Sequence, residues 1–136
     1  MTDDDLVELQ RVHPELSAIV LLAYRRYRLL RSDRTFKVTS GYRTRSAQAA
    51  LVRAGKSQTM ASYHLDGLAV DLAILTADRS AAIWELDACR YLNEVMQRAA
   101  QTLHCRLTWG GDWIKLRDGV HWQLEDRLST YPALIR

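Results

Sequence analysis

The apolar run from Leu68 to Leu75 constrains the fold most strongly, because a single carboxylate, Asp71, interrupts it. A short, almost continuous apolar run predicts a buried strand. Alternation along that strand places Asp71 on the same face as two small residues, Ala69 and Ala73. A buried carboxylate is costly unless it is paired or bound to a metal. The two partners to consider are therefore an arginine, in a salt bridge, and a metal ion.

The pattern around this strand predicts an α+β fold. A chain of 136 residues fits one domain, which we place over residues 1–136. We expect about three helices packed on a small, mostly antiparallel sheet. The predicted helices run from Pro14 to about Leu30, from the N-cap Thr44 to about Ala54, and from Asp78 or Ser80 to about Leu103.

The other predicted elements are strands and one loop. A strand is expected at Phe36–Ser40, and residues 55–67 lack any periodicity and are interpreted as an exposed loop. Asp118-Gly119 separates two strand-like runs, Ile114–Arg117 and Val120–Leu124, and this pattern predicts a hairpin.

Composition excludes several classes of protein. With 48% hydrophobic and 26% charged residues, the chain is neither disordered nor of low complexity. The net charge is only +3, and no nucleic-acid-binding motif is present, so we expect no nucleic-acid partner. A cluster of arginines is interpreted as a solvated helix face, with attraction to an anionic polymer as the alternative: Arg25, Arg26, Arg28, Arg31 and Arg34.

The cysteines and the N-terminus bear on location. Cys89 and Cys105 form no CxxC pair, so both are interpreted as reduced, with a disulfide as the alternative. The chain begins Met-Thr-Asp-Asp-Asp, which is not a secretory signal, and its apolar stretch at Ile19–Ala23 is too short for membrane insertion. We therefore expect synthesis in the cytoplasm, and a monomer.

Two histidines accompany Asp71. His64 lies seven positions earlier, in the loop that leads into the strand, and Gly67 between them allows a sharp turn. His121 lies in the strand-like run Val-His-Trp-Gln-Leu, and it can face Asp71 if the two strands are neighbours. Two imidazoles and one carboxylate, with a fourth position left for water, are typical of a catalytic zinc site.

Asp118 and Arg43 are further candidates for chemistry. Asp118 lies three residues before His121, where it is explained either as a turn residue or as a general base beside an activated water. Arg43 lies between a strand and a helix. It is either a surface arginine or a group that holds a carbonyl oxygen or a substrate carboxylate.

Four motifs in this order carry a family resemblance: Ser40-Gly41-Tyr42-Arg43, Ser62-x-His64-x-x-Gly67-x-Ala69-x-Asp71, Trp109-Gly110-Gly111-Asp112-Trp113 and Asp118-x-x-His121-x-Gln123. Together they resemble the D-alanyl-D-alanine carboxypeptidase/VanY-type zinc peptidases. The resemblance is nearest to the phage endolysin branch, the L-alanyl-D-glutamate endopeptidases. It covers about residues 10–125, and the opening Val12-His13-Pro14-Glu15-Leu16 also resembles that branch.

The resemblance implies a role for each motif residue. It implies one Zn²⁺ held by His64, Asp71 and His121, with Asp118 as the catalytic base and Arg43 as the arginine of the transition state or substrate. It also implies that three further residues line the cleft and contact substrate: Ser62, Trp109 and Trp113.

The implied activity is hydrolysis of the L-alanyl-D-glutamate bond in the peptidoglycan stem peptide, which causes lysis of the bacterial cell. An enzyme without a signal peptide would stay in the host cytoplasm until a separate pore protein releases it to the cell wall. Two alternatives remain open. One is a D,D-carboxypeptidase or D-Ala-D-Ala dipeptidase of the same family, and the other is a non-catalytic protein that binds the cell wall.

Overall fold

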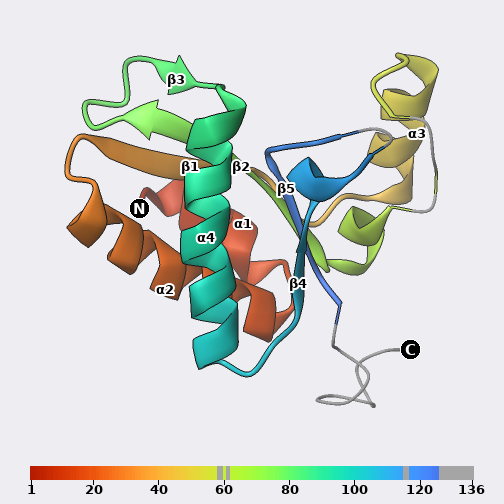
Figure 1. The fold of residues 1–136 in the computed structure, drawn as a ribbon. Helices are drawn as coiled ribbons and strands as arrows, with labels where there is room; N and C mark the ends of the chain where they lie inside the picture. Colours follow the sequence, from red (N-terminus) through yellow and green to blue (C-terminus); the bar gives the residue numbers. More distant parts are fainter. Residues whose placement is uncertain (58–59, 61, 115–116, 126–136) are drawn as a thin grey trace.

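The computed structural model describes residues 1–57, 60, 62–114 and 117–125. These residues form an α+β domain in which helices pack on an antiparallel sheet (Figure 1). The helices longer than one turn are α1 (Asp3–Gln10), α2 (Pro14–Leu30), α3 (Arg45–Arg53) and α4 (Leu86–Thr102). The strands are β1 (Arg34–Ser40), β2 (Ala69–Thr76), β3 (Ala82–Ile83), β4 (Leu107–Trp109) and β5 (His121–Leu124).

Strand β2 is the centre of the sheet, whose order is β1-β2-β5-β4 with β3 also paired to β2. Every pairing is antiparallel. The register places Asp71 opposite His121 of β5 on one side and opposite Ser40 of β1 on the other. Strand pairing alone therefore brings three distant parts of the sequence together at the same end of β2.

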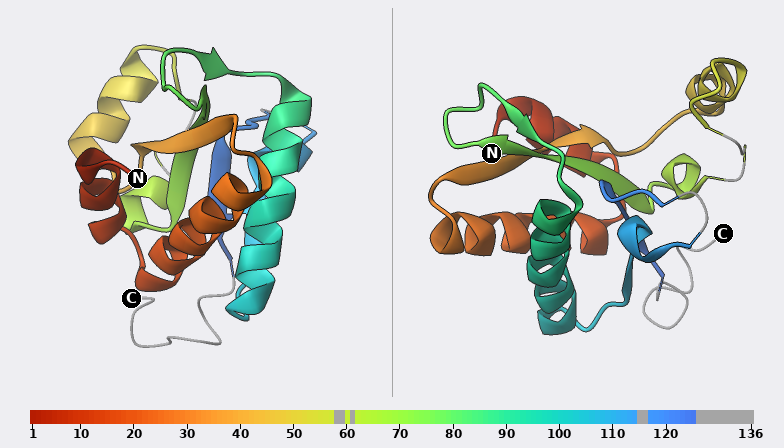
Figure 2. Two further views of the ribbon diagram at one scale, coloured as in Figure 1. Left: turned by 90° about the vertical axis from the view of Figure 1, so that its left-hand side faces the viewer. Right: turned by 45° about the horizontal axis from the view of Figure 1, so that its top comes forward.

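Helices α2 and α4 pack against each other and against the sheet (Figures 1 and 2). Their apolar faces enclose the core, whose largest fully buried side chains include Tyr27, Phe36, Trp109 and Trp122. Burial of each such aromatic contributes about 2 to 3 kcal/mol, so the sheet that carries Asp71 rests on a well-packed support. None of the helices in the described part of the chain has the length and apolar character needed to cross a bilayer.

Most of the predicted elements are confirmed. Helix α2 begins at Pro14, strand β1 contains Phe36–Ser40, and Thr44 caps α3 through a hydrogen bond from the Ala47 N–H (3.1 Å). Both cysteines are buried, and Cys89 lies on α4, as expected.

The structure differs from the predicted elements in four places. First, α1 was not expected, although Thr2 and Asp5 form a capping box at its start. Secondly, α4 begins at Leu86 rather than at Asp78 or Ser80, because the Asp78 carboxylate accepts hydrogen bonds from Thr76 and Ser80 and closes a turn between β2 and β3.

Thirdly, Asp118-Gly119 does not connect a hairpin. The described residues of Ile114–Arg117 are not in a strand (115 and 116 lie outside the described residues), and β5 pairs with β2 and β4 instead. The loop expected at residues 55–67 also contains a short 3-10 helix, η1 (Tyr63–Asp66), and His64 within it is buried rather than exposed.

Candidate active site

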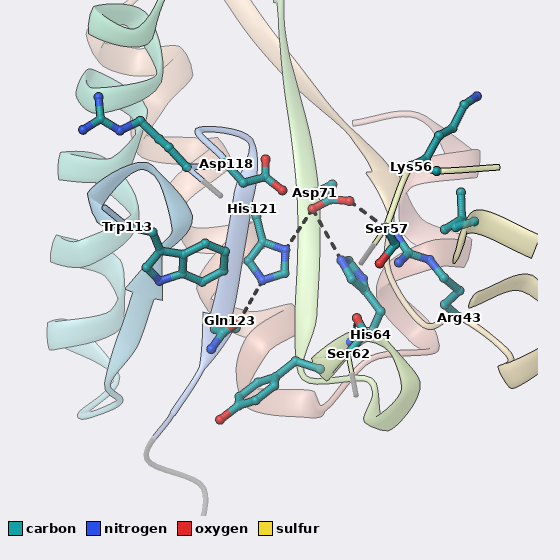
Figure 3. A pocket seen from close by; sticks show the side chains of 14 residues that line it. Arg43, Lys56, Ser57, Ser62, His64, Asp71, Trp113, Asp118, His121 and Gln123 are labelled. Carbon is teal, nitrogen blue, oxygen red and sulfur yellow. Dashed lines mark hydrogen bonds and ion pairs between the residues drawn. The ribbon is translucent and has the colours of Figure 1, made fainter. Parts of the chain in front are cut away.

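The structure brings the three expected ligand residues together (Figure 3). His64 comes from η1, Asp71 from β2 and His121 from β5. The Oδ1 atom of Asp71 lies 3.4 Å from His64 Nε2 and 3.2 Å from His121 Nδ1. One donor atom from each residue lies within 4.8 Å of the other two. Among the described residues this is the one cluster of at least three such groups that could hold a metal ion.

Each imidazole is oriented by a hydrogen bond on the side away from the cluster. His64 Nδ1 lies 2.7 Å from the carbonyl oxygen of Gly41, which can only accept, so this nitrogen carries the hydrogen. His121 Nε2 lies 2.8 Å from Gln123 Oε1, and the Gln123 amide nitrogen donates to Glu125, which fixes the orientation of the amide. Such outer hydrogen bonds set the tautomer of a histidine that binds metal.

The consequence is that, in the neutral form of each histidine, an unprotonated nitrogen faces the Asp71 carboxylate. His64 Nε2 and His121 Nδ1 each present a lone pair towards Asp71 Oδ1, since their opposite nitrogens donate elsewhere. Three electron-rich atoms that face one another require a cation between them, either a proton or a metal ion. The donor set, two imidazole nitrogens and one carboxylate oxygen, is one that Zn²⁺ accepts in catalytic sites.

The electrostatics of the metal-free cluster agree with this arrangement. Burial raises the pKa of Asp71, but hydrogen bonds from His121 and His64 outweigh it and hold that pKa well below the usual range. Burial lowers the pKa of His121, but its hydrogen bonds to Asp71 and Gln123 and the nearby carboxylates raise it overall. Without a metal, both shifts favour a protonated His121 beside an ionised Asp71.

Asp118 faces the same cavity, beside His121 (Figure 3). Its position is set by the backbone: the Asp118 N–H donates to Gly110 O (3.0 Å), and the Asp118 carbonyl accepts from the His121 N–H (3.3 Å). Burial, followed by repulsion from Asp71, raises the pKa of the Asp118 carboxyl above its usual value. The carboxylate is therefore a better proton acceptor than an exposed aspartate.

Arg43 lies across the cluster from Asp118, on the α3 side of the cavity (Figure 3). Its guanidinium donates to Gln48 Oε1 (2.8 Å) and Ser40 Oγ (2.9 Å) and lies 3.6 Å from Asp71 Oδ2. Gln48 was not predicted to be a site residue, yet its fully buried side chain holds Arg43 in place. The sequence signal that could have revealed this role is the spacing, because Gln48 follows Arg43 by five residues and lies on one face of the short helix α3.

The cavity that contains these groups has a volume of about 840 Å³. Ser62 lines it, and its hydroxyl also accepts the His64 N–H at the start of η1. Trp113 forms part of one wall, with its ring centroid 5.2 Å from that of His121. Two further basic side chains, Lys56 and Arg117, line the same cavity.

Trp109 does not line the cavity, so the prediction of substrate contact is wrong for this residue. Its side chain is 1% exposed and stacks on Trp122 in the core, with ring centroids 6.4 Å apart. The indole N–H donates to the carbonyl oxygen of Gly119 (2.8 Å). Trp109 thus holds the backbone next to Asp118 in place and does not contact a ligand in the cavity.

Comparison with known proteins identifies the family. A model of the phage L-alanyl-D-glutamate peptidase family matches residues 1–128. The chain belongs to this family. The resemblance inferred from the four motifs is therefore confirmed, and with it the assignment to the endolysin branch.

Two relatives place the chain more closely. The L-alanyl-D-glutamate peptidase of Listeria phage A118 is 35% identical over 82 residues, which is 60% of this chain and 27% of that protein. The chain therefore spans about a quarter of the length of this curated relative. The crystal structure of the Serratia marcescens L-Ala D-Glu endopeptidase ChiX matches with a TM-score of 0.80 and 38% identity, covering 98% of this chain and 93% of that one.

Proposed function

We propose that this protein is a zinc-dependent endopeptidase that hydrolyses the L-alanyl-D-glutamate bond of the peptidoglycan stem peptide and so lyses bacterial cells. The observation that carries the proposal is the convergence of two imidazole nitrogens on Asp71 beside a half-buried carboxylate, Asp118. Family membership supports the choice of bond. The two named relatives, each described as an L-Ala-D-Glu peptidase, support it further.

His64, Asp71 and His121 would hold one zinc ion. Three protein ligands leave coordination open, as in catalytic rather than structural zinc sites, and neither Cys89 nor Cys105 belongs to the cluster. When bound, zinc supplies Lewis-acid chemistry, which makes water more acidic and polarises a carbonyl group.

Asp118 is the general base and then the general acid. It takes a proton from the attacking water as the water oxygen bonds to the carbonyl carbon of L-alanine. It then delivers this proton to the leaving amine nitrogen of D-glutamate as the C–N bond breaks. The raised pKa of the Asp118 carboxyl suits both steps, because a base of intermediate strength can accept a proton and release it again.

Arg43 stabilises the negative charge that develops on the carbonyl oxygen. Its guanidinium is held by Gln48 and Ser40, so no reorganisation is needed when the charge appears. Ser62 and Trp113 line the cleft in which the peptide lies. Lys56 and Arg117 add positive charge to the cavity walls, which favours a peptide that carries carboxylates next to the bond to be cut.

The test is digestion of purified peptidoglycan with the zinc-loaded protein, with and without a chelator, followed by mass analysis. We expect muropeptides with new N-terminal D-glutamate, formed only when zinc is present. Release of free D-alanine or of D-Ala-D-Ala would instead assign a D,D-carboxypeptidase or dipeptidase. No cleavage by the zinc-loaded protein would refute the proposal and favour a protein that only binds the wall.

The cellular setting follows from the same proposal. The partner is the stem peptide in the cell wall, which the enzyme reaches after release from the host cytoplasm. A wall substrate needs no stable membrane insertion. We expect the protein to act as a monomer, because every group assigned above comes from one chain.

A further inference from the structure

Helix α1, which the sequence did not predict, lies against the edge strand β1 and presents two carboxylates to it. Asp5 and Glu8 are three residues apart and therefore share one face of the helix. Asp5 Oδ1 accepts the Val38 N–H (2.8 Å), and Glu8 Oε1 accepts the Gly41 N–H (3.2 Å). Each carboxylate thus satisfies one backbone donor on this side of the sheet.

The hydrogen bonds at Val38 and at Gly41 differ in their distance from the metal cluster along the backbone. Val38 leads back into the strand, whereas Gly41 precedes the motif arginine and its carbonyl oxygen accepts from His64 Nδ1 (2.7 Å). The approach at Gly41 is close: a Cβ atom added there would lie 3.1 Å from Val12 Cγ1 and 3.2 Å from the backbone oxygen of Glu8. A side chain at this position would push α1 away from the peptide that orients His64.

We propose that Glu8 is a positioning residue for the metal site, acting through the Gly41 backbone on His64. Glu8 accepts the Gly41 N–H, and the Gly41 carbonyl, in the next peptide group, accepts from His64 Nδ1, so Glu8 fixes the position of Gly41 and keeps the hydrogen bond at Nδ1 short and strong. A stronger bond there makes Nε2, the nitrogen that faces Asp71, a better metal ligand.

Neighbouring backbone hydrogen bonds fix the segment that carries His64 relative to Gly41. The His64 carbonyl accepts from the Arg43 N–H (2.9 Å), and the Gly67 carbonyl accepts from the His13 N–H (2.8 Å). The segment that carries His64 is therefore tied both to the Gly41 side and to the turn that follows α1. The inference rests on the proposed function only in that it takes the cluster to bind zinc.

The experiment measures zinc affinity by competition with a chromophoric chelator, and needs no substrate. Outer hydrogen-bond partners of metal ligands typically alter affinity by about 10- to 100-fold. We expect Glu8→Ala to weaken zinc binding by about tenfold or more. Glu8→Gln keeps the acceptor oxygen but loses the charge, and we expect it to weaken binding by only a few-fold.

Asp5→Asn is the matched control. It removes a carboxylate from the same face of α1 and the same side of β1, and we expect a lower melting temperature of the metal-free protein with unchanged zinc affinity. A second readout is the NMR signal of the His64 Nδ1–H in the zinc-loaded protein. It should move in both Glu8 variants and stay in place in Asp5→Asn, even if Glu8→Ala folds poorly.

The outcomes separate this inference from the proposed function. A wild-type protein that binds no zinc would overturn both. Wild-type zinc affinity and an unmoved His64 signal in both Glu8 variants would overturn only the role of Glu8. Equal losses of affinity in Asp5→Asn and Glu8→Ala would also overturn it, because they would assign α1 a general structural role.

Discussion

Replacing Asp118 by asparagine isolates proton transfer from every other property of the site. The backbone of residue 118 is held by hydrogen bonds to Gly110 O and from the His121 N–H, and neither involves the side chain. The side-chain hydrogen bond from the Val120 N–H to Asp118 Oδ1 (3.4 Å) can also be made by an asparagine oxygen. The change therefore removes a charge and a proton acceptor and leaves the geometry intact.

The expected loss of activity is large. General acid–base groups contribute about 10²- to 10⁴-fold to rate, which corresponds to about 3 to 5 kcal/mol of activation free energy at 1.36 kcal/mol per factor of ten. Asp118 both accepts and returns the proton, so we expect the upper half of this range for kcat. KM for the peptide and zinc content should change little, because Asp118 is not among the three ligands.

Asp118→Asn should increase the stability of the metal-free protein although it lowers activity. The pKa of Asp118 is raised by burial and by repulsion from Asp71, so the folded metal-free protein binds a proton more readily than the unfolded chain does. Stability from this group is present at low pH and is lost as pH rises through the raised pKa. At neutral pH the charged carboxylate destabilises the fold, and Asp118→Asn should raise the melting temperature of the metal-free protein.

The assays are release of new amino termini from purified peptidoglycan, zinc analysis, and calorimetry in the presence of a chelator. Asp87→Asn, an exposed aspartate at the start of α4, is the matched control and should behave as wild type. If Asp118→Asn with a full complement of zinc kept more than a tenth of the wild-type kcat, Asp118 would not be the base. Loss of zinc in this variant would instead make it a ligand.

Three further predictions follow from the same geometry. A Cβ atom at Gly110 would lie 2.4 Å from the carbonyl oxygen of Asp118, so Gly110→Ala should displace the base and lower kcat more than tenfold, while zinc analysis still finds one ion per chain. His121, whose pKa is raised above its ordinary value of 6.5, stabilises the metal-free fold below that pH, and this stability is lost as pH rises through the raised pKa. As pH rises through this pKa, the melting temperature of the metal-free protein should therefore fall and the zinc affinity of the protein should rise, because zinc must displace the proton. A zinc affinity that does not depend on pH would contradict this. Lys56→Ala and Arg117→Ala should each raise KM by a few-fold for peptides with a free D-glutamate carboxylate and not for their amides, as expected for partly exposed ion pairs. Equal effects on KM for both substrates in steady-state kinetics would argue against charge recognition.

The sequence predicted that His64, Asp71 and His121 come together, because their chemistry is visible without the fold. A carboxylate in an apolar run requires a partner, and the nearby histidines offered one. The structure adds the register, in which Asp71 and His121 are directly opposite on adjacent strands. It also adds the outer acceptors, Gly41 and Gln123. A backbone carbonyl has no sequence signature, so the role of the Gly41 carbonyl could not have been predicted from the sequence.

The errors arose where a local signal competed with a long-range contact. Asp118-Gly119 has the composition of a hairpin turn, but the Asp118 N–H bonds to Gly110 and the Trp109 indole bonds to the Gly119 carbonyl. These contacts hold the segment against η2 (Gly110–Asp112) and leave β5 to pair with β2 and β4. Turn propensity could not reveal them, because both partners lie eight or more residues away.

The core position of Trp109 explains how a largely buried cluster of His64, Asp71 and His121 lies beside an open cleft. The Trp-Gly-Gly-Asp-Trp segment has one tryptophan on each side of the sheet end: Trp109 packs in the core, and Trp113 lines the cavity. The backbone between them passes so close to Asp118 that a side chain at Gly110 would collide with its carbonyl. The base is therefore fixed from the core side, independently of the cavity wall. A change in the cavity wall, for example at Trp113, should therefore leave Asp118 in place relative to His64, Asp71 and His121.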